Sequence, residues 1–209
     1  KEQGKLPAAG IAVGEADTVA AVKKWAGHLD NKWLFAGAGD FFTALLEKKY
    51  RQLVTPGVKM LSPYLYICGT AFEERRNYIQ HLAAKQQCVA YMQKELEEEW
   101  LDIAGNCISS KKKLVLAIDE SKLPAVVLRR KMAKAAKQLI ERNGVKEIFI
   151  EGGSTAAAVL QQLDITQLMV VNELGRGVVR MKAGDLFITV KPGSYQLPEE
   201  IKRIMSDEL

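Results

Sequence analysis

Short apolar runs alternate with amphipathic segments along almost the whole chain, and this alternation constrains the fold more than any other feature. The runs are partly β-branched and have the length of buried strands, whereas the segments between them repeat apolar residues at helical spacing. The expected strands are residues 10–14, 32–39, 64–70, 88–92, 113–119 and 148–151. Such repetition is typical of βαβ units around a mostly parallel sheet with helices on both faces, so we predict an α/β fold.

After residue 166 the pattern changes, and strand-like runs follow one another through short turns. Residues 167–174 and 177–191 carry these runs, and a short helix is expected within residues 192–205. Strands joined by tight turns pair antiparallel, so we expect antiparallel strands at one edge of the sheet. No linker, internal repeat or low-complexity segment interrupts the sequence. Residues 1–209 are therefore predicted to form a single domain.

The composition favours a globular protein without a membrane segment. With 209 residues and 48% hydrophobic content, the chain can bury one sizeable core. No window approaches about 18 uninterrupted apolar residues, and the first residues lack a signal-peptide core, so a cytoplasmic location and no membrane partner are expected. The three cysteines, Cys68, Cys88 and Cys107, form no CxxC pair. From their odd number we expect neither a disulfide framework nor a zinc site.

The net charge is +5, but basic and acidic residues are interspersed along the chain. We therefore do not expect a nucleic-acid partner, because the charge suits an anionic small ligand equally well. A basic nucleic-acid-binding module stays open as a weaker alternative that rests on the charge alone.

Glycine-containing turns follow four of the expected strands. They occupy residues 36–40, 68–74, 151–157 and 191–196. In open parallel sheets the carboxyl ends of the strands share one edge, where ligands bind, so these turns are expected to converge on a pocket rich in backbone N–H donors. The sequence contains neither a Walker loop nor the GxGxxG motif, which argues against NAD or FAD bound in the Rossmann manner.

The turn Gly152-Gly153-Ser154-Thr155 has two interpretations. Its glycines allow positive φ, and Ser154 or Thr155 could simply cap the helix that follows. The same geometry would aim free N–H groups and the positive end of the helix at one spot, where a phosphate is stabilised. This stretch alone leaves both a structural turn and a phosphate cradle open.

Three further polar residues stand at strand ends, and each also has two interpretations. Thr70 could offer its hydroxyl to a ligand or cap the next helix. Lys191 could reach a phosphate with its ammonium group or lie in solvent. Asp119 could hold Mg²⁺ through water or serve as a loop or capping residue. No Ser-His-Asp set, HExxH motif or pair of carboxylates stands out, so we assign no catalytic residue and predict no protein metal site.

Several motifs resemble, in the same order, the C-terminal nucleotide-binding region of the four-carbon acid sugar kinases. They are LFAGAGDFFTALL, YLYICGT with RRNYIQ, IFIEGGSTAAAVLQQL, NELGRGVVRM and FITVKPGSYQ. The resemblance extends from about Gly10 to Ile201. It implies that the predicted domain over residues 1–209 binds a nucleotide. The nucleotide contacts that it implies are Thr70, Gly152, Gly153, Ser154, Thr155 and Gly193.

The resemblance also implies a reaction and a partner. ATP would bind with Mg²⁺ between two domains, and its γ-phosphoryl group would be transferred to a hydroxyl of a threonate- or erythronate-type acid. Family members carry the sugar-acid-binding domain in their first half. We expect this domain to be absent from residues 1–209 and to be supplied in cis or by a partner chain. The sequence also leaves a homo-oligomer open.

Two positions depart from the family pattern. Ser154 stands where an acidic residue is common, and Gln196 stands where a glycine is usual. A lost carboxylate at residue 154 could alter contacts to the metal or the ribose. The alternative function is therefore a stand-alone, non-catalytic module that binds a nucleotide or another phosphorylated metabolite.

Overall fold

The computed structural model describes residues 8–28, 30, 32–50, 59–93, 98–118 and 123–206. They fall into two compact units, a first unit within Lys1–Val54 and a second unit within Thr55–Leu209. The prediction of one domain over residues 1–209 stays a prediction, and each unit is described by itself. Asp119 lies outside the described residues. Among the helices that are described, none is long and apolar enough to cross a membrane.

The first unit consists of two helices that pack against each other, α1 (Val19–Ala26) and α2 (Gly39–Lys49). An ion pair of 2.8 Å between Lys23 and Glu47 joins them. The segments before these helices form no strand, so the strands predicted at residues 10–14 and 32–39 are wrong. An apolar pattern makes a strand only when a neighbouring strand pairs with its backbone groups, and neither segment has such a neighbour among the described residues. The turn at residues 36–40 consequently opens α2 instead of ending a strand.

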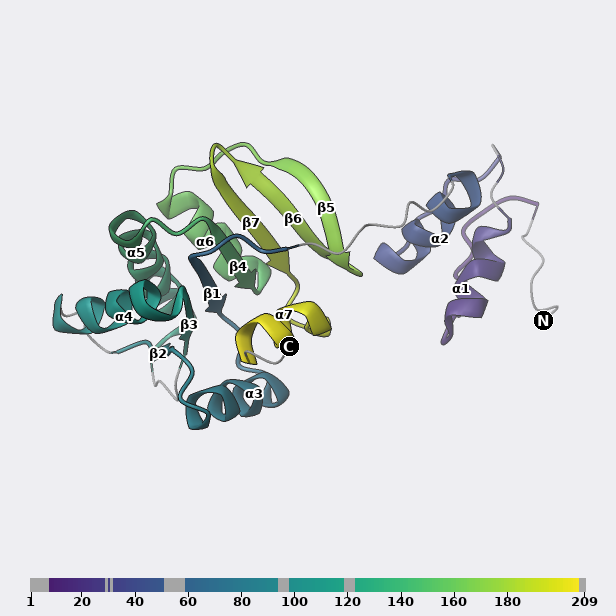
Figure 1. Ribbon diagram of the computed structural model, residues 1–209. Helices are drawn as coiled ribbons and strands as arrows, with labels where there is room; N and C mark the ends of the chain where they lie inside the picture. The colour runs from purple at the N-terminus through teal and green to yellow at the C-terminus, as the bar shows by residue number, and fades with distance from the viewer. Residues whose placement is uncertain are drawn as a thin grey trace. The chain divides into compact units, whose positions relative to one another are not determined.

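The second unit is built on a seven-stranded sheet with the strand order β2-β3-β1-β4-β7-β6-β5 (Figure 1). Neighbouring strands from β2 to β7 run parallel, whereas β5, β6 and β7 pair antiparallel at the other edge. The strands are β1 (Tyr64–Cys68), β2 (Val89–Tyr91), β3 (Lys113–Ala117), β4 (Glu147–Glu151), β5 (Met169–Gly175), β6 (Val178–Ala183) and β7 (Leu186–Lys191). The predicted α/β fold, with antiparallel strands near the C-terminus, is confirmed.

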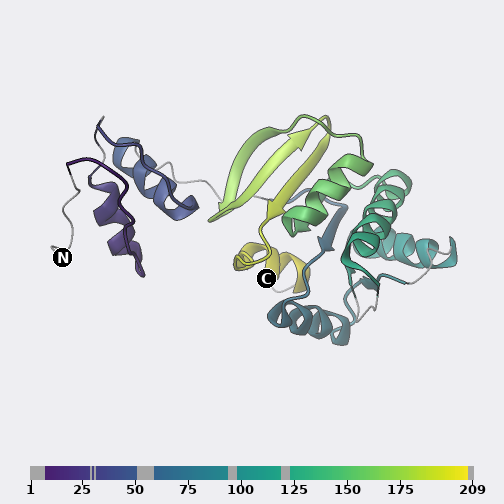
Figure 2. The ribbon, with the colours of Figure 1, turned by 180° about the vertical axis from the view of Figure 1, so that it is seen from behind.

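Helices cover both faces of this sheet (Figure 2). On one face lie α3 (Glu73–Ala84) and α7 (Glu199–Ser206), and on the other lie α4 (Glu98–Lys111), α5 (Ala125–Asn143) and α6 (Gly153–Gln162). Side chains alternate along β1, because Leu65 and Ile67 enter the core with α4 to α6 while Tyr66 and Cys68 enter the core with α3 and α7. Burial on both faces explains why β1, β3 and β4 are buried at every position.

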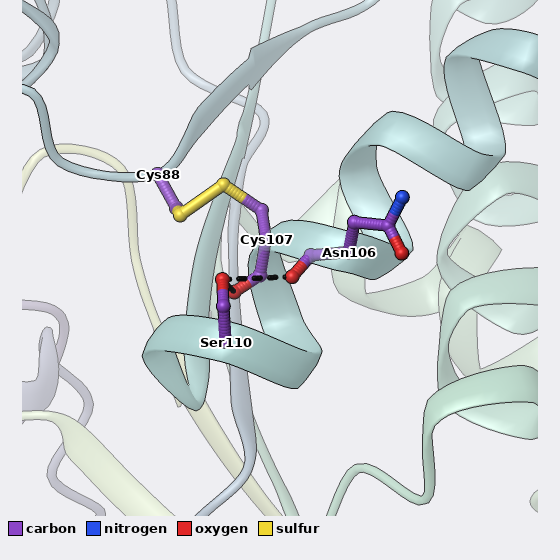
Figure 3. Close-up of a disulfide and its surroundings, with 4 residues drawn as sticks. All are labelled: Cys88, Asn106, Cys107 and Ser110. Carbon is purple, nitrogen blue, oxygen red and sulfur yellow. Dashed lines mark hydrogen bonds between the residues drawn. A yellow bond between two sulfur atoms is a disulfide. The ribbon is translucent and has the colours of Figure 1, made fainter.

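A disulfide joins Cys88, just before β2, to Cys107 on α4 (Figure 3). The expectation that the cysteines form no disulfide is wrong for this pair, while Cys68 is a free, buried thiol. Spacing along the sequence could not reveal the pair, because it depends on α4 packing beside the edge strand. The cross-link therefore ties β2 at the edge of the sheet to the helix layer.

Reduction of this disulfide is expected to destabilise the protein. Cross-linking residues 19 apart removes loop entropy from the unfolded chain worth about 3 kcal/mol. Urea unfolding with and without reductant measures the difference. The Cys88→Ser/Cys107→Ser double variant is the control, and its stability should not respond to reductant. Equal stability of the oxidised and reduced wild-type protein would contradict the expectation.

Candidate functional site

Three of the four predicted glycine turns meet at one edge of the sheet. The strands β1, β4 and β7 are parallel neighbours, and their last residues Cys68, Glu151 and Lys191 lie in register. The Gly69 N–H donates to the Glu151 carbonyl over 3.1 Å, and the Gly152 N–H donates to the Lys191 carbonyl over 2.9 Å. These hydrogen bonds extend the pairing beyond the strands, so the turns after them lie side by side.

The turn after β4 leads into the N-terminus of α6, which no side chain caps. Gly152 has a φ of 103°, a conformation that favours glycine. Ser154 is exposed and does not cap the helix, so the interpretation of this turn as a side-chain cap is wrong. A Cβ at Gly153 would meet no atom within 4 Å. The first turn of α6 thus presents its positive end beside open space, an arrangement that stabilises an anion.

Thr155 lies at the centre of this arrangement. Thr155 is 1% exposed, and its Oγ1 atom is buried without a hydrogen-bond partner in the part of the chain that the structure describes. Buried hydroxyls in folded proteins almost always have a partner, so this oxygen has an unused capacity for a hydrogen bond near the start of α6. Gly69 makes room for this side chain, because a Cβ there would lie 2.6 Å from the Thr155 Cβ.

Two further predicted residues, Thr70 and Gly193, lie in the turns after β1 and β7. Thr70 is half-buried, and its Oγ1 accepts a long hydrogen bond of 3.4 Å from the Phe72 N–H. It does not cap α3, whose N-cap is Phe72. A Cβ at Gly193 would lie 3.5 Å from the Thr70 Oγ1, so these two turns are in close proximity.

Lys191 does not lie in solvent, which excludes that interpretation. Its side chain is fully buried, and its Nζ donates to the Glu151 Oε1 over 2.9 Å. The same ammonium donates to the carbonyls of Pro192, over 2.7 Å, and Gly193, over 3.4 Å. A direct contact between Lys191 and a phosphate stays a prediction.

Reasoning from the sequence missed Glu151 as the centre of a buried polar cluster. Its Oε2 accepts a 2.5 Å hydrogen bond from the Tyr66 hydroxyl, and Arg75 of α3 pairs with the same oxygen over 2.9 Å. With Lys191, the cluster joins α3, β1, β4 and β7 beneath the turns. The available signal was a carboxylate ending the apolar run "IFIE", since a charge in a buried strand needs a partner.

The hairpin between β5 and β6 packs on the last of the three turns. Gly177 has a φ of 68°, and a Cβ there would overlap the ring of Tyr195. The Gly177 N–H donates to the Glu173 Oε1 over 2.6 Å. Two of the motifs noted in the sequence, NELGRG and KPGSY, therefore pack against each other.

Replacing Gly69 and Gly153 with alanine is expected to have opposite effects on the free energy of unfolding. Gly69→Ala forces a methyl group against Thr155, and such overpacking lowers the free energy of unfolding by about 1–3 kcal/mol. Gly153→Ala places its methyl in open space at the start of a helix, where alanine costs nothing and gains up to about 1 kcal/mol over glycine. Urea unfolding of both variants measures these effects. Equal losses for the two variants would contradict the geometry.

The Cys68 thiol is expected to make stability fall at alkaline pH. Burial, with the negative charge of Glu151 adding to it, raises the pKa of Cys68 from 9.0 to about 11. The unfolded chain therefore loses this proton at lower pH than the folded protein, and the thiol's contribution declines as pH rises from 9 to 11.

Cys68→Ala removes this effect and leaves the other titrating groups in place. The stability of the wild-type protein relative to this variant should fall by about 2 kcal/mol between pH 8 and pH 10.5. Urea unfolding at both pH values checks it, and a difference that does not change with pH would refute the assignment.

Comparison with known proteins agrees with this geometry. The profile of a family described as the nucleotide-binding C-terminal domain matches residues 70–195, more than half of the 209 residues. The match includes all three converging turns from Thr70 onwards and confirms the resemblance to a nucleotide-binding C-terminal region. No curated protein matches the sequence.

Solved structures share the fold. A DUF1537 protein from Bordetella bronchiseptica, with bound citrate and as a domain-swapped dimer, is 18% identical with a TM-score of 0.55, over 91% of this chain and 51% of that chain. A DUF1537 protein from Haemophilus influenzae is 16% identical with a TM-score of 0.60, over 93% of this chain and 53% of that chain. A Salmonella typhimurium LT2 protein, described as a proposed tRNA synthase, is 13% identical with a TM-score of 0.62, over 93% of this chain and 51% of that chain.

At these identities the similarity shows the fold alone, and this chain spans about half the length of each of the three. The profile match is the stronger finding, since it covers the strands β2 to β7, the helices between them and the turns at the edge of the sheet from Thr70 onwards. The chain belongs to the nucleotide-binding C-terminal domain family.

Proposed function

We propose that the second unit binds ATP at the edge formed by the turns after β1, β4 and β7, as the nucleotide-binding part of a kinase for a four-carbon sugar acid of the threonate or erythronate type. The observation that carries this proposal is the orphaned Thr155 hydroxyl beside the uncapped N-terminus of α6. A phosphate would accept from the N–H groups of Gly153 to Thr155 and supply the partner that the hydroxyl lacks.

The residues at this edge fit the phosphates of a nucleotide. Gly152, Gly153, Ser154 and Thr155 would hold them, with Thr70 and Gly193 on the adjoining turns. Mg²⁺ would arrive with ATP and neutralise the phosphate charge that develops during transfer. Within the described ranges no group of three or more His, Cys, Asp or Glu residues could hold a metal on its own. In this proposal the second unit binds and orients the phosphates.

Exposed apolar side chains in the first unit favour the presence of a partner domain. Ile11, Val13 and Leu34 are 97%, 90% and 97% exposed, and large apolar side chains so exposed favour an interaction surface. We propose that a sugar-acid-binding domain, in cis or in a partner chain, covers them, and that nucleotide binding belongs to the second unit. The Bordetella protein, which has about half its length outside the match and holds citrate, is consistent with a domain for a small acid. Its domain-swapped dimer also motivates a homo-oligomer here.

Ser154 supports an alternative, a module that binds a nucleotide or another phosphorylated metabolite without catalysis. Its exposed hydroxyl stands at the start of α6, where the resembling kinases commonly have a carboxylate. Combining the chain with a sugar-acid-binding domain of the family, ATP-Mg²⁺ and D-threonate or D-erythronate distinguishes the two functions. ADP release that depends on the acid supports the kinase, and nucleotide binding without release supports the module.

Gly153→Val is expected to weaken ATP binding without loss of stability. The new side chain enters the open space beside the N-terminus of α6, where a Cβ would contact no other part of the protein. Ala157→Val is the matched control, because Ala157 is exposed one turn further along the same helix. Calorimetric titration with ATP-Mg²⁺ should show an ATP affinity reduced at least about tenfold for Gly153→Val. A loss of this size corresponds to about one hydrogen bond to a charged group.

The control variant should bind ATP like the wild-type protein. A wild-type protein that shows no heat and no thermal shift at millimolar nucleotide would contradict the proposed function, because a bound ligand must stabilise the folded state. Equal affinity of Gly153→Val and the wild-type protein would place the nucleotide elsewhere.

A further inference from the structure

We propose that Glu151 and Lys191 are positioning residues that orient the turn after β7 for the nucleotide, without touching the nucleotide themselves. This inference rests on the proposed function, because it assigns roles to residues beneath the same edge of the sheet. It differs from the prediction that Lys191 contacts a phosphate directly. The fully buried side chain of Lys191 would have to leave three acceptors to do so.

The contacts of Lys191 determine which way the peptide groups of the turn face. Its Nζ draws the carbonyl of Pro192 inward over 2.7 Å and the carbonyl of Gly193 inward over 3.4 Å. In a planar trans peptide the N–H points opposite to the C=O of the same unit. The N–H groups of Gly193 and Ser194 therefore point away from the buried ammonium. Lys191 thus selects the orientation in which these two donors are available to an anion.

Glu151 holds Lys191 in this place. Its Oε1 accepts from the Lys191 Nζ over 2.9 Å and from the Arg75 Nε over 3.1 Å, and its Oε2 accepts from Tyr66. Each oxygen of the carboxylate is bound, so the group has little freedom. Because Glu151 is also the last residue of β4, the cluster fixes the turn after β7 relative to the turn that opens α6.

The same strand provides a matched control at its other end. Glu147 begins β4, is fully buried, and binds the guanidinium of Arg180 over 2.7 Å and 2.8 Å. Glu147 and Glu151 are therefore alike in residue type, burial and pairing with an arginine. Glu151 lies beneath the turns and also binds Lys191 and Tyr66, whereas Glu147 lies at the opposite end of the strand and also accepts from the Leu61 N–H over 2.7 Å. Glu147→Gln reports the general cost of disturbing a buried ion pair.

Calorimetric titration of the full chain with ATP-Mg²⁺ tests the inference. Glu151→Gln is expected to lower ATP affinity at least about tenfold, and Glu147→Gln to leave it within about twofold, although both variants lose stability. A direct phosphate contact by Lys191 predicts the opposite result, because Glu151→Gln frees the lysine and adds positive charge. Affinity of Glu151→Gln equal to or above that of the wild-type protein, or equal losses in both variants, would overturn the inference.

A second pair of variants applies if Glu151→Gln does not fold. Lys191→Met leaves Glu151 paired with Arg75, and Arg180→Met is its control at the other end of β4. Lys191→Met should again lower ATP affinity at least about tenfold, and Arg180→Met should not. Equal ATP affinity of the two methionine variants would overturn the inference.

Amide hydrogen exchange gives a readout that does not need the nucleotide. The Tyr195 N–H donates to the Pro192 carbonyl over 3.1 Å, so its exchange reports whether the turn keeps its shape. In the ligand-free protein, this amide should exchange several-fold faster in Glu151→Gln and Lys191→Met than in Glu147→Gln and Arg180→Met. Equal exchange would refute positioning even if the wild-type protein bound no ATP, whereas absent binding with faster exchange would refute only the proposed function.

Discussion

The parallel register of β1, β4 and β7 is the constraint on which the rest of the site depends. Because Cys68, Glu151 and Lys191 lie side by side, the turns after the three strands must emerge at one place. The hydrogen bonds from Gly69 and Gly152 carry this pairing into the turns themselves. Residues far apart in the sequence, Thr70, Thr155 and Gly193, thereby become neighbours without any loop having to fold back on itself.

Side-chain alternation along the same strands creates the buried cluster. Glu151 and Lys191 point to the face covered by α3, where Arg75 and Tyr66 complete their hydrogen bonds. Buried charges are tolerated only when they are paired in this way, so the cluster requires α3, β1, β4 and β7 to be assembled together. The edge of the sheet is therefore preorganised, and a ligand there would gain affinity because little remains to be ordered.

The sequence predicted the fold well where local patterns carry the information. Apolar strands such as residues 64–68 and the glycine turns at residues 152–153 and 193 are visible without a structure, and the structure brings those turns together. The prediction failed where pairing decides the outcome. Residues 10–14 and 32–39 have strand-like composition but pair with no strand among the described residues, and the cysteines pair only because α4 packs beside β2. The role of Lys191 was ambiguous for the same reason, since its partner Glu151 is 40 residues away.

The central claim is that a nucleotide binds at the turns after β1, β4 and β7. Backbone amide chemical-shift mapping of the isotope-labelled chain during titration with ATP-Mg²⁺ tests it most directly. The largest shifts are expected on Thr70, on residues 152–155 and on residues 193–194, while the antiparallel strand β5 should change little. Shifts concentrated on other parts of the second unit, with these turns unaffected, would contradict it.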